Sequence, residues 1–268
     1  MATVDVFIVA GQSNAEGRGD SGSSPAVTAG YEADASGVTP LADPVGGADT
    51  GSAWPAFANA YYSATGIPVA IIEASEGGTA LVAAADNGGG NWSPTGDLYN
   101  DMVTLVGAAM TQLDSAGHTA TIRGVLWHQG ERDAQAGIAA ATYQDGLEQF
   151  ADDVDTEWGV DLYVLRVGAP NSGDTSAWQA IRDAQDDTAT TSTLVHIVYT
   201  DCVDFPGLGW MADNLHYTQT GYNDMGTTAG SIVAELVHPT PGGLVAVTTT
   251  NGAGTPITTT GITTRAVA

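Results

Sequence analysis

Apolar runs and amphipathic stretches alternate along most of the chain. Five nearly continuous apolar runs, rich in Val, Ile and Leu, are separated by longer stretches with helical periodicity. Strands that are apolar on both faces are buried on both faces, which is typical of parallel sheets. The alternation predicts an α/β fold, a parallel sheet of about five strands with helices on both faces. The predicted strands are 4–10, 67–74, 122–127, 162–167 and 194–200, and the predicted helices are 53–64, 98–116, 138–158, 176–188 and 221–237.

Two segments do not follow this alternation. Residues 20–52 are rich in Gly, Ser, Ala, Asp and Pro, which predicts a long loop. Residues 239–268 are rich in Thr, Gly and Val and contain no acidic residue. We therefore expect one domain over 1–238 and a short β-prone tail over 239–268. A flexible tail and a tail that docks on another chain, giving a homo- or hetero-oligomer, are both compatible with this composition.

The chain is strongly acidic. It has 31 Asp and Glu residues against six Lys and Arg residues, for a formal net charge of −25. Such a charge is repelled by nucleic acids and by anionic membrane surfaces, so neither is an expected partner. Molar salt shortens the Debye length to about 3 Å and screens the repulsion among the carboxylates. The acidity therefore favours a halophilic protein, adapted to high salt.

Apolar runs, the amino-terminal residues and the cysteine content bear on where the protein is located. No apolar run approaches the length of a membrane span, so membrane insertion is not expected. The amino-terminal residues lack the basic and apolar regions of a secretory signal. A single cysteine, Cys202, excludes an intramolecular disulfide. We expect an extracellular or virion-associated location rather than a cytoplasmic one.

A candidate nucleophile follows the first predicted strand. The run ends at Gly11 and Ser13 comes two residues later, at the edge of the sheet where parallel α/β proteins bind ligands. Serine needs a nearby base to become nucleophilic. Of the five histidines, His216 has the best context, because Asp213 precedes it by three residues in a segment rich in turn formers. One short turn could then direct the carboxylate at the imidazole, as in a Ser-His-Asp triad.

Four separate blocks resemble, in order, the motifs of the SGNH hydrolase superfamily. Within it they are similar to the sialate O-acetylesterase-like group and to carbohydrate esterase family six, the acetylxylan esterases. The resemblance covers about residues 4–237, and Glu16 stands where the family usually has a small residue. The blocks are Gly11-Gln12-Ser13-Asn14, Glu76-Gly77-Gly78-Thr79, Trp127-His128-Gln129-Gly130-Glu131-Arg132-Asp133 and Asp213-Asn214-Leu215-His216.

The resemblance implies a three-layer α/β/α, flavodoxin-like fold and a set of site residues. It implies Ser13 as the nucleophile, His216 as the general base and Asp213 as the acid that orients it. An oxyanion hole would come from the backbone N–H of Ser13, a glycine N–H of the second block and the side-chain amide of Gln129. Gly77 is favoured as that glycine, with Gly78 as the alternative. The supporting residues implied are Gln12, Asn14, Gly78 and Glu131.

Two functions are compatible with these features. The first is a hydrolase, a serine esterase that removes O-acetyl groups from a carbohydrate through an acyl-enzyme, with an acetylated glycan as its partner. The second is a structural or receptor- and glycan-binding component of an assembly, such as a virion, built on an SGNH domain. No histidine pair or cysteine cluster has the spacing of metal ligands, so neither a metal nor another cofactor is expected.

Overall fold

The computed structural model describes residues 2–48, 50–239, 247–250 and 256–259. Within these residues the core is a seven-stranded sheet in the order β3-β2-β4-β1-β5-β6-β7. Neighbouring strands are parallel except at the edge, where β2 and β3 are antiparallel. The strands are β1 (Thr3–Gly11), β2 (Gly30–Ala33), β3 (Val38–Pro40), β4 (Val69–Glu73), β5 (Thr119–His128), β6 (Asp161–Leu165) and β7 (Val195–Tyr199).

The five predicted strands are confirmed as β1, β4, β5, β6 and β7, and they form the parallel part of the sheet. The prediction of an unbroken loop over residues 20–52 was wrong, because this segment contains β2 and β3. Both are very short, and β2 gains its regular structure by pairing with the edge of β4. Their sequences are Gly-Tyr-Glu-Ala and Val-Thr-Pro. Neither contains an apolar run of the kind that predicts a strand.

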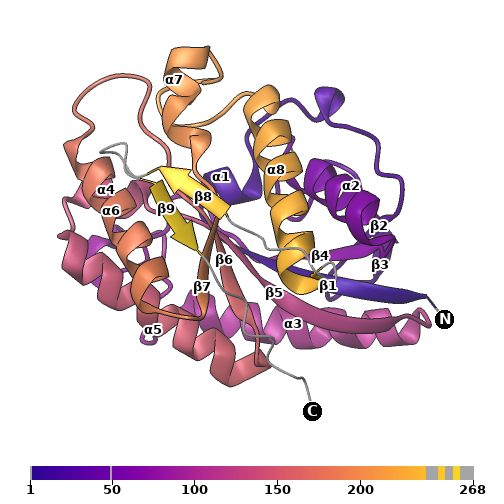
Figure 1. Cartoon of the computed structure of the whole chain (residues 1–268). Coiled ribbons are helices and arrows are strands. Elements are labelled where there is room, and N and C mark those ends of the chain that lie inside the picture. Colours follow the sequence, from indigo (N-terminus) through magenta and orange to yellow (C-terminus); the bar gives the residue numbers. More distant parts are fainter. Residues whose placement is uncertain (1, 49, 240–246, 251–255, 260–268) are drawn as a thin grey trace.

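Helices cover both faces of the sheet and complete a three-layer α/β/α arrangement. Figure 1 shows α2 and α8 on one side and α3 and α5 on the other. Alternate residues of β1 face the two layers: Val6 and Ile8 pack on the α3 and α5 side, and Phe7 and Val9 on the α2 and α8 side. The helices are α1 (Ser13–Glu16), α2 (Trp54–Thr65), α3 (Asp97–Ser115), α4 (Glu131–Ala136), α5 (Ala140–Trp158), α6 (Ser176–Thr191), α7 (Phe205–Leu208) and α8 (Gln219–Val237).

The strand order reverses at the centre of the sheet. The chain passes from β1 to β2, β3 and β4 on one side, and then to β5, β6 and β7 on the other. Ligands of open parallel sheets bind beyond the carboxyl ends of the strands at such a reversal. The segment that follows β1 begins with α1, so it lies at this position (Figure 1).

The tail contains two short strands. β8 (Val247–Thr250) and β9 (Pro256–Thr259) form an antiparallel pair, so these β-prone segments do adopt strand structure. The rest of the predicted tail, apart from its first residue, lies outside the described residues. Its expected role in flexibility or assembly stays a prediction, as does the alternative function that rested on it. In the part of the chain that the structure describes, no helix is long and apolar enough to cross a membrane.

The charge of the chain gives a first testable expectation. A net charge of −25 on 268 residues makes the folded state repel itself. Raising sodium chloride from about 0.1 to about 2 M shortens the Debye length from about 10 Å to below 3 Å. We therefore expect the melting temperature, followed by circular dichroism, to rise over this range. A melting temperature that does not change with salt would show that repulsion among the carboxylates does not affect the thermal stability of the fold.

Candidate active site

The turn after β1 holds Ser13 at the edge of the sheet. Gly11 has a φ angle of 136°, and a Cβ atom there would lie 2.2 Å from the carbonyl oxygen of His128 on β5. Only glycine allows this close approach. The Gln12 N–H donates to the same carbonyl at 3.1 Å, and the chain then enters α1 at Ser13. Ser13 keeps 8% of its surface exposed, so its hydroxyl lies at the boundary between the core and the solvent.

Ser13, His216 and Asp213 form a continuous hydrogen-bonded chain. The Ser13 Oγ lies 2.9 Å from the His216 Nε2, and the His216 Nδ1 lies 2.7 Å from the Asp213 Oδ2. Partial burial disfavours the charged carboxylate of Asp213, but hydrogen bonds from the His216 side chain and from two backbone N–H groups outweigh it and lower its pKa. The ionised carboxylate therefore holds a proton on His216 Nδ1 and leaves Nε2 free to accept the serine proton.

A small hairpin presents His216 and Asp213. The N–H groups of Leu215 and His216 both donate to the Asp213 Oδ1 at 2.7 Å, and the Ala212 N–H donates to the His216 carbonyl at 2.8 Å. The Asn171 N–H donates to the Asn214 carbonyl at 2.9 Å and ties the hairpin to the loop after β6. His216 and Asp213 are thus held in place by the backbone as well as by each other.

Asn14 connects α1 to this hairpin. Its side-chain amide donates to the Glu131 Oε1 at 2.7 Å and to the Leu215 carbonyl at 3.1 Å. Its oxygen accepts the hydroxyl of Tyr222 on α8 at 2.7 Å. Asn14 and Glu131 are both buried, so they brace the site from beneath and do not contact the solvent. These contacts suit the supporting roles that the sequence assigned to them.

The side-chain amide of Gln129 makes several hydrogen bonds within the protein. Its side-chain nitrogen donates to the Asp133 Oδ2 at 2.6 Å, to the Thr79 carbonyl at 3.0 Å and to the Gln12 Oε1 at 3.2 Å. The residue is fully buried. Both amide hydrogens therefore already have acceptors, and neither is free for an oxyanion. Gln129 thus holds Gln12, Thr79 and Asp133 together beneath the site, and its expected oxyanion role stays a prediction.

A second prediction follows from these contacts of Gln129. Replacing Gln129 by methionine leaves the Asp133 carboxylate and the Thr79 carbonyl short of a buried donor. We expect a loss of about 1–3 kcal/mol in the free energy of unfolding, measured by urea denaturation. Gln149→Met, at an exposed position on α5, should cost far less. A large fall in kcat in Gln129→Met, with an unchanged free energy of unfolding, would instead indicate that Gln129 stabilises the oxyanion.

The turn after β4 supplies backbone donors. Gly77 N–H is taken by the Glu16 carboxylate, whereas no acceptor among the described residues is paired with the N–H of Gly78 or of Ser13. Gly78 has a φ angle of 76°, and nothing lies within 4 Å of the position where its Cβ would be. Its surroundings are therefore open. Gly78, the alternative left by the sequence, fits a free donor better than the favoured Gly77.

Three of the other histidines have hydrogen-bond partners in the fold. His128 is fully buried, with its Nδ1 2.6 Å from the Leu165 carbonyl. His196 bonds to Asp161 at 2.9 Å, and His238 bonds to Asp5 at 2.6 Å. Burial raises the pKa of the Cys202 thiol well above its ordinary value, so this thiol stays protonated. Within the described residues, no group of three or more His, Cys, Asp or Glu side chains could hold a metal ion.

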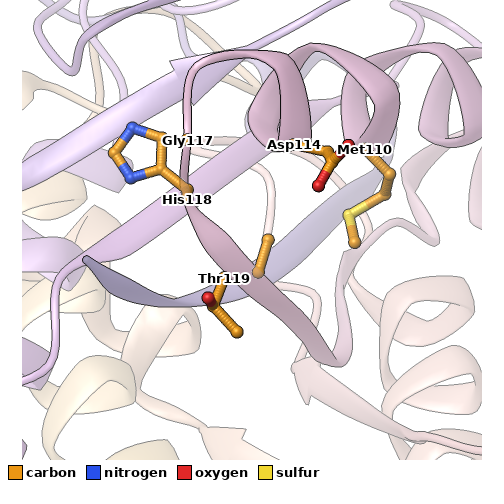
Figure 2. Close-up of a pocket in the computed structure, with 6 residues that line it drawn as sticks. Met110, Asp114, Gly117, His118 and Thr119 are labelled. Atoms are coloured by element: carbon orange, nitrogen blue, oxygen red, sulfur yellow. The ribbon is translucent and has the colours of Figure 1, made fainter. Parts of the chain in front are cut away.

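A cavity of about 350 Å³ lies at the other end of the molecule. Figure 2 shows around it Met110 and Asp114 from the end of α3, His118 from the turn that follows, and Thr119 at the start of β5. Because β5 runs parallel to β1, its first residues lie at the edge of the sheet opposite to Ser13. This cavity contains no residue of the hydrogen-bonded chain and is separate from the candidate active site.

Three side chains of the site were not found from the sequence. Tyr222 supports Asn14, Tyr143 donates to the Gln129 Oε1 at 3.0 Å, and Arg18 forms an ion pair with Glu16. The two tyrosines occupy ordinary apolar positions of α8 and α5, so the sequence carries no sign of their polar contacts. Glu16 and Arg18 lie close together in the sequence. Their spacing, however, does not indicate that they contact the turn after β4.

Most of the chain matches a known protein family. Residues 3–235 match the family model of carbohydrate esterase, sialic acid-specific acetylesterase. Among curated protein sequences, none matches the chain.

Solved structures share the fold at low sequence identity. An Arabidopsis thaliana protein, AT4G34215, is 20% identical with a TM-score of 0.68, over 87% of this chain and 98% of that one. NanS is 14% identical with a TM-score of 0.62, over 87% of this chain and 97% of that one. XAC1771, a carbohydrate acetylesterase from Xanthomonas citri, is 18% identical with a TM-score of 0.57, over 91% of this chain and 58% of that one.

Proposed function

Because the chain belongs to the sialic acid-specific acetylesterase family of carbohydrate esterases, we propose that it removes O-acetyl groups from an acetylated glycan through an acetyl-serine intermediate. The observation that carries this proposal is the chain of two short hydrogen bonds from Ser13 through His216 to Asp213. A serine hydroxyl, a base within reach of its proton and an acid that orients the base are the requirements for nucleophilic acyl transfer.

The first half of the reaction forms the acyl-enzyme. His216 Nε2 takes the proton of Ser13 as the serine oxygen attacks the acetyl carbonyl carbon. The negative charge that develops on the carbonyl oxygen is stabilised by the N–H groups of Ser13 and Gly78. His216 then gives its proton to the departing sugar oxygen, the ester bond to the sugar breaks, and the acetyl group stays on Ser13.

The second half repeats these steps with water. His216 removes a proton from a water molecule, whose oxygen attacks the acetyl carbonyl of acetyl-Ser13. Returning the proton to the Ser13 oxygen releases acetate and restores the free serine. Asp213 stays ionised throughout and stabilises the imidazolium, in line with its lowered pKa.

Two measurements test this function. The protein should release acetate from an O-acetylated sugar, and a serine-directed phosphonate should become attached to Ser13, as located by mass spectrometry of peptides. The variant His216→Ala should lose the labelling, because the hydroxyl is then not activated. Labelling of a serine other than Ser13, or labelling that persists without His216, would contradict the mechanism.

A further inference from the structure

A glycine-rich loop packs against the turn that carries the proposed oxyanion donor. The loop spans residues 86–91 and has three glycines in succession, at positions 88–90. A Cβ atom at Gly89 would lie 3.1 Å from the carbonyl oxygen of Gly78 and 3.5 Å from its carbonyl carbon. The backbone of Gly89 is therefore in close contact with Gly78, and a side chain there would push the Gly78 carbonyl aside.

Hydrogen bonds join the end of the loop to the turn. The Ala80 N–H donates to the Gly90 carbonyl at 3.1 Å, and the Trp92 N–H donates to the Ala80 carbonyl at 2.9 Å. The indole N–H of the buried Trp92 donates to the Thr79 hydroxyl at 3.1 Å. Because Thr79 and Ala80 directly follow Gly78, the loop and the turn are bonded together beside the donor.

Asp86 holds the loop in shape. Its Oδ1 accepts the N–H groups of Gly88 at 2.8 Å and Gly90 at 3.1 Å, and its Oδ2 accepts the Asn91 amide at 3.0 Å. Gly88 and Gly90 have φ angles of 102° and 98°, which side chains rarely tolerate. Gly89 does not have a positive φ angle, so its backbone conformation does not require glycine. The close contact with the turn does.

The turn itself has little to fix its conformation. Gly77 and Gly78 are consecutive glycines, and glycine is the residue with the most backbone freedom. The Glu16 carboxylate holds the Gly77 N–H, whereas nothing lies within 4 Å of the Cβ position of Gly78. A donor stabilises an oxyanion best when its direction is fixed before the reaction. The contact with Gly89 supplies such a restraint from outside the turn.

The segment between the turn and the loop is anchored to α4. The two carboxylate oxygens of Asp133 accept the N–H groups of Leu81 at 2.9 Å and Val82 at 3.0 Å. Arg132 Nε donates to the Ala85 carbonyl at 2.7 Å, directly before the loop begins. Since α4 closely follows the central strand β5, the loop is held by the frame of the sheet and not by the turn alone.

We propose that Gly89 is a positioning residue of the oxyanion hole: the loop 86–91, shaped by Asp86, packs on Gly78 and directs its N–H at the oxygen that becomes charged. This proposal rests on the esterase function and on the donor role of Gly78 proposed above. A displaced Gly78 would make a longer and more bent hydrogen bond, which is weaker. The loss would fall on the transition state, where the oxygen carries its charge, more than on the bound ester.

Gly89→Ala is the first test, because it adds one methyl group at an exposed position. With 4-nitrophenyl acetate we expect kcat/KM to fall about tenfold, as a small misplacement of a catalytic group does. Phenylboronic acid forms a tetrahedral adduct with a catalytic serine, so its inhibition constant should rise by about the same factor. Gly37→Ala is the matched control and should change neither value, because nothing lies within 4 Å of that Cβ position.

Two variants of Asp86 test the loop without changing a glycine, and they decide the matter should Gly89→Ala fail to fold. Asp86→Ala removes the acceptor of the Gly88 and Gly90 N–H groups, so it should lower kcat/KM and the affinity for phenylboronic acid together. Asp86→Asn keeps a side-chain oxygen that can accept both N–H groups and should recover most of the loss. Melting temperatures, measured alongside, separate this effect from a general loss of stability.

The contrary results are distinct. In Gly89→Ala, a kcat/KM within about twofold of the wild type, or a fall in kcat/KM with unchanged boronate inhibition, would overturn the positioning role and leave the esterase function standing. Equal losses in Asp86→Ala and Asp86→Asn would also overturn it, because the charge of Asp86 and not the shape of the loop would then matter. A wild type that hydrolyses neither 4-nitrophenyl acetate nor an O-acetylated sugar would overturn the esterase function, and the positioning proposal with it.

Discussion

Alanine at position 13 is expected to lower the turnover of acetyl esters by about 10⁴- to 10⁶-fold, the range seen when a triad serine is removed. The reason is that the Ser13 Oγ is the atom that would form the acyl-enzyme, and it lies 2.9 Å from the base. Initial rates with 4-nitrophenyl acetate, with the background hydrolysis subtracted, would measure the loss.

Further variants separate this chemistry from damage to the fold. Ser13→Ala should melt at nearly the wild-type temperature, and Ser115→Ala, at an exposed serine at the end of α3, should keep full activity. His216→Ala should be nearly as damaging as Ser13→Ala, and Asp213→Asn somewhat less so, since the three groups act as a unit. Activity in Ser13→Ala within tenfold of the wild type would exclude Ser13 as the nucleophile.

The parallel part of the fold could be predicted from the sequence because its strands are long apolar runs. A run such as Val4–Ala10 is buried on both faces, and such runs are typical of strands in parallel sheets. The edge strands β2 and β3 could not be predicted in the same way. They have only four and three residues, and they are strands because of the neighbours they pair with, which lie far away in the sequence.

In the candidate site, too, local contacts could be predicted from the sequence and contacts between distant residues could not. The Asp213–His216 spacing is local, so one short turn was sufficient to predict that the two side chains meet. The role of Gln129 depends on distant acceptors, Thr79 and Gln12, whose positions the sequence does not give. An amide in a motif can face the substrate or the core, and only the fold decides which. In this structure the side-chain amide of Gln129 donates a hydrogen bond to the buried carboxylate of Asp133.

A fully buried carboxylate, Asp5, joins four elements at the other end of the sheet. On β1, its Oδ1 accepts Arg123 Nε of β5 at 2.7 Å. Its Oδ2 accepts the hydroxyl of Tyr61 on α2 at 2.7 Å and lies 2.6 Å from the Nε2 of His238, directly after α8. Burial acts to raise the pKa of Asp5, but the hydrogen bonds from His238, Tyr61 and Arg123 outweigh burial and lower it.

Asp5→Asn should therefore cause the largest loss of stability. The variant leaves Arg123 and His238 without their buried anion, and breaking such a pair costs about 3–5 kcal/mol. Urea denaturation at pH 7 would measure the difference from the wild type. Asp101→Asn, an exposed change on α3, serves as the matched control and should be close to neutral. If Asp5→Asn cannot be purified folded, Tyr61→Phe removes one of the hydrogen bonds and should cost about 1 kcal/mol.

The pH dependence of this loss has a definite sign. The pKa of Asp5 is lower in the folded protein than the value of about 3.9 in an unfolded chain. The stability from its ionised form is fully present above that unfolded value and is lost as the pH falls through the folded pKa. The difference in the free energy of unfolding between wild type and Asp5→Asn should thus be fully present at neutral pH and should narrow below about pH 4. A gap below about 1 kcal/mol at pH 7, or one that does not narrow below about pH 4, would show that the charge of Asp5 does not stabilise the junction of the sheet with α2 and α8.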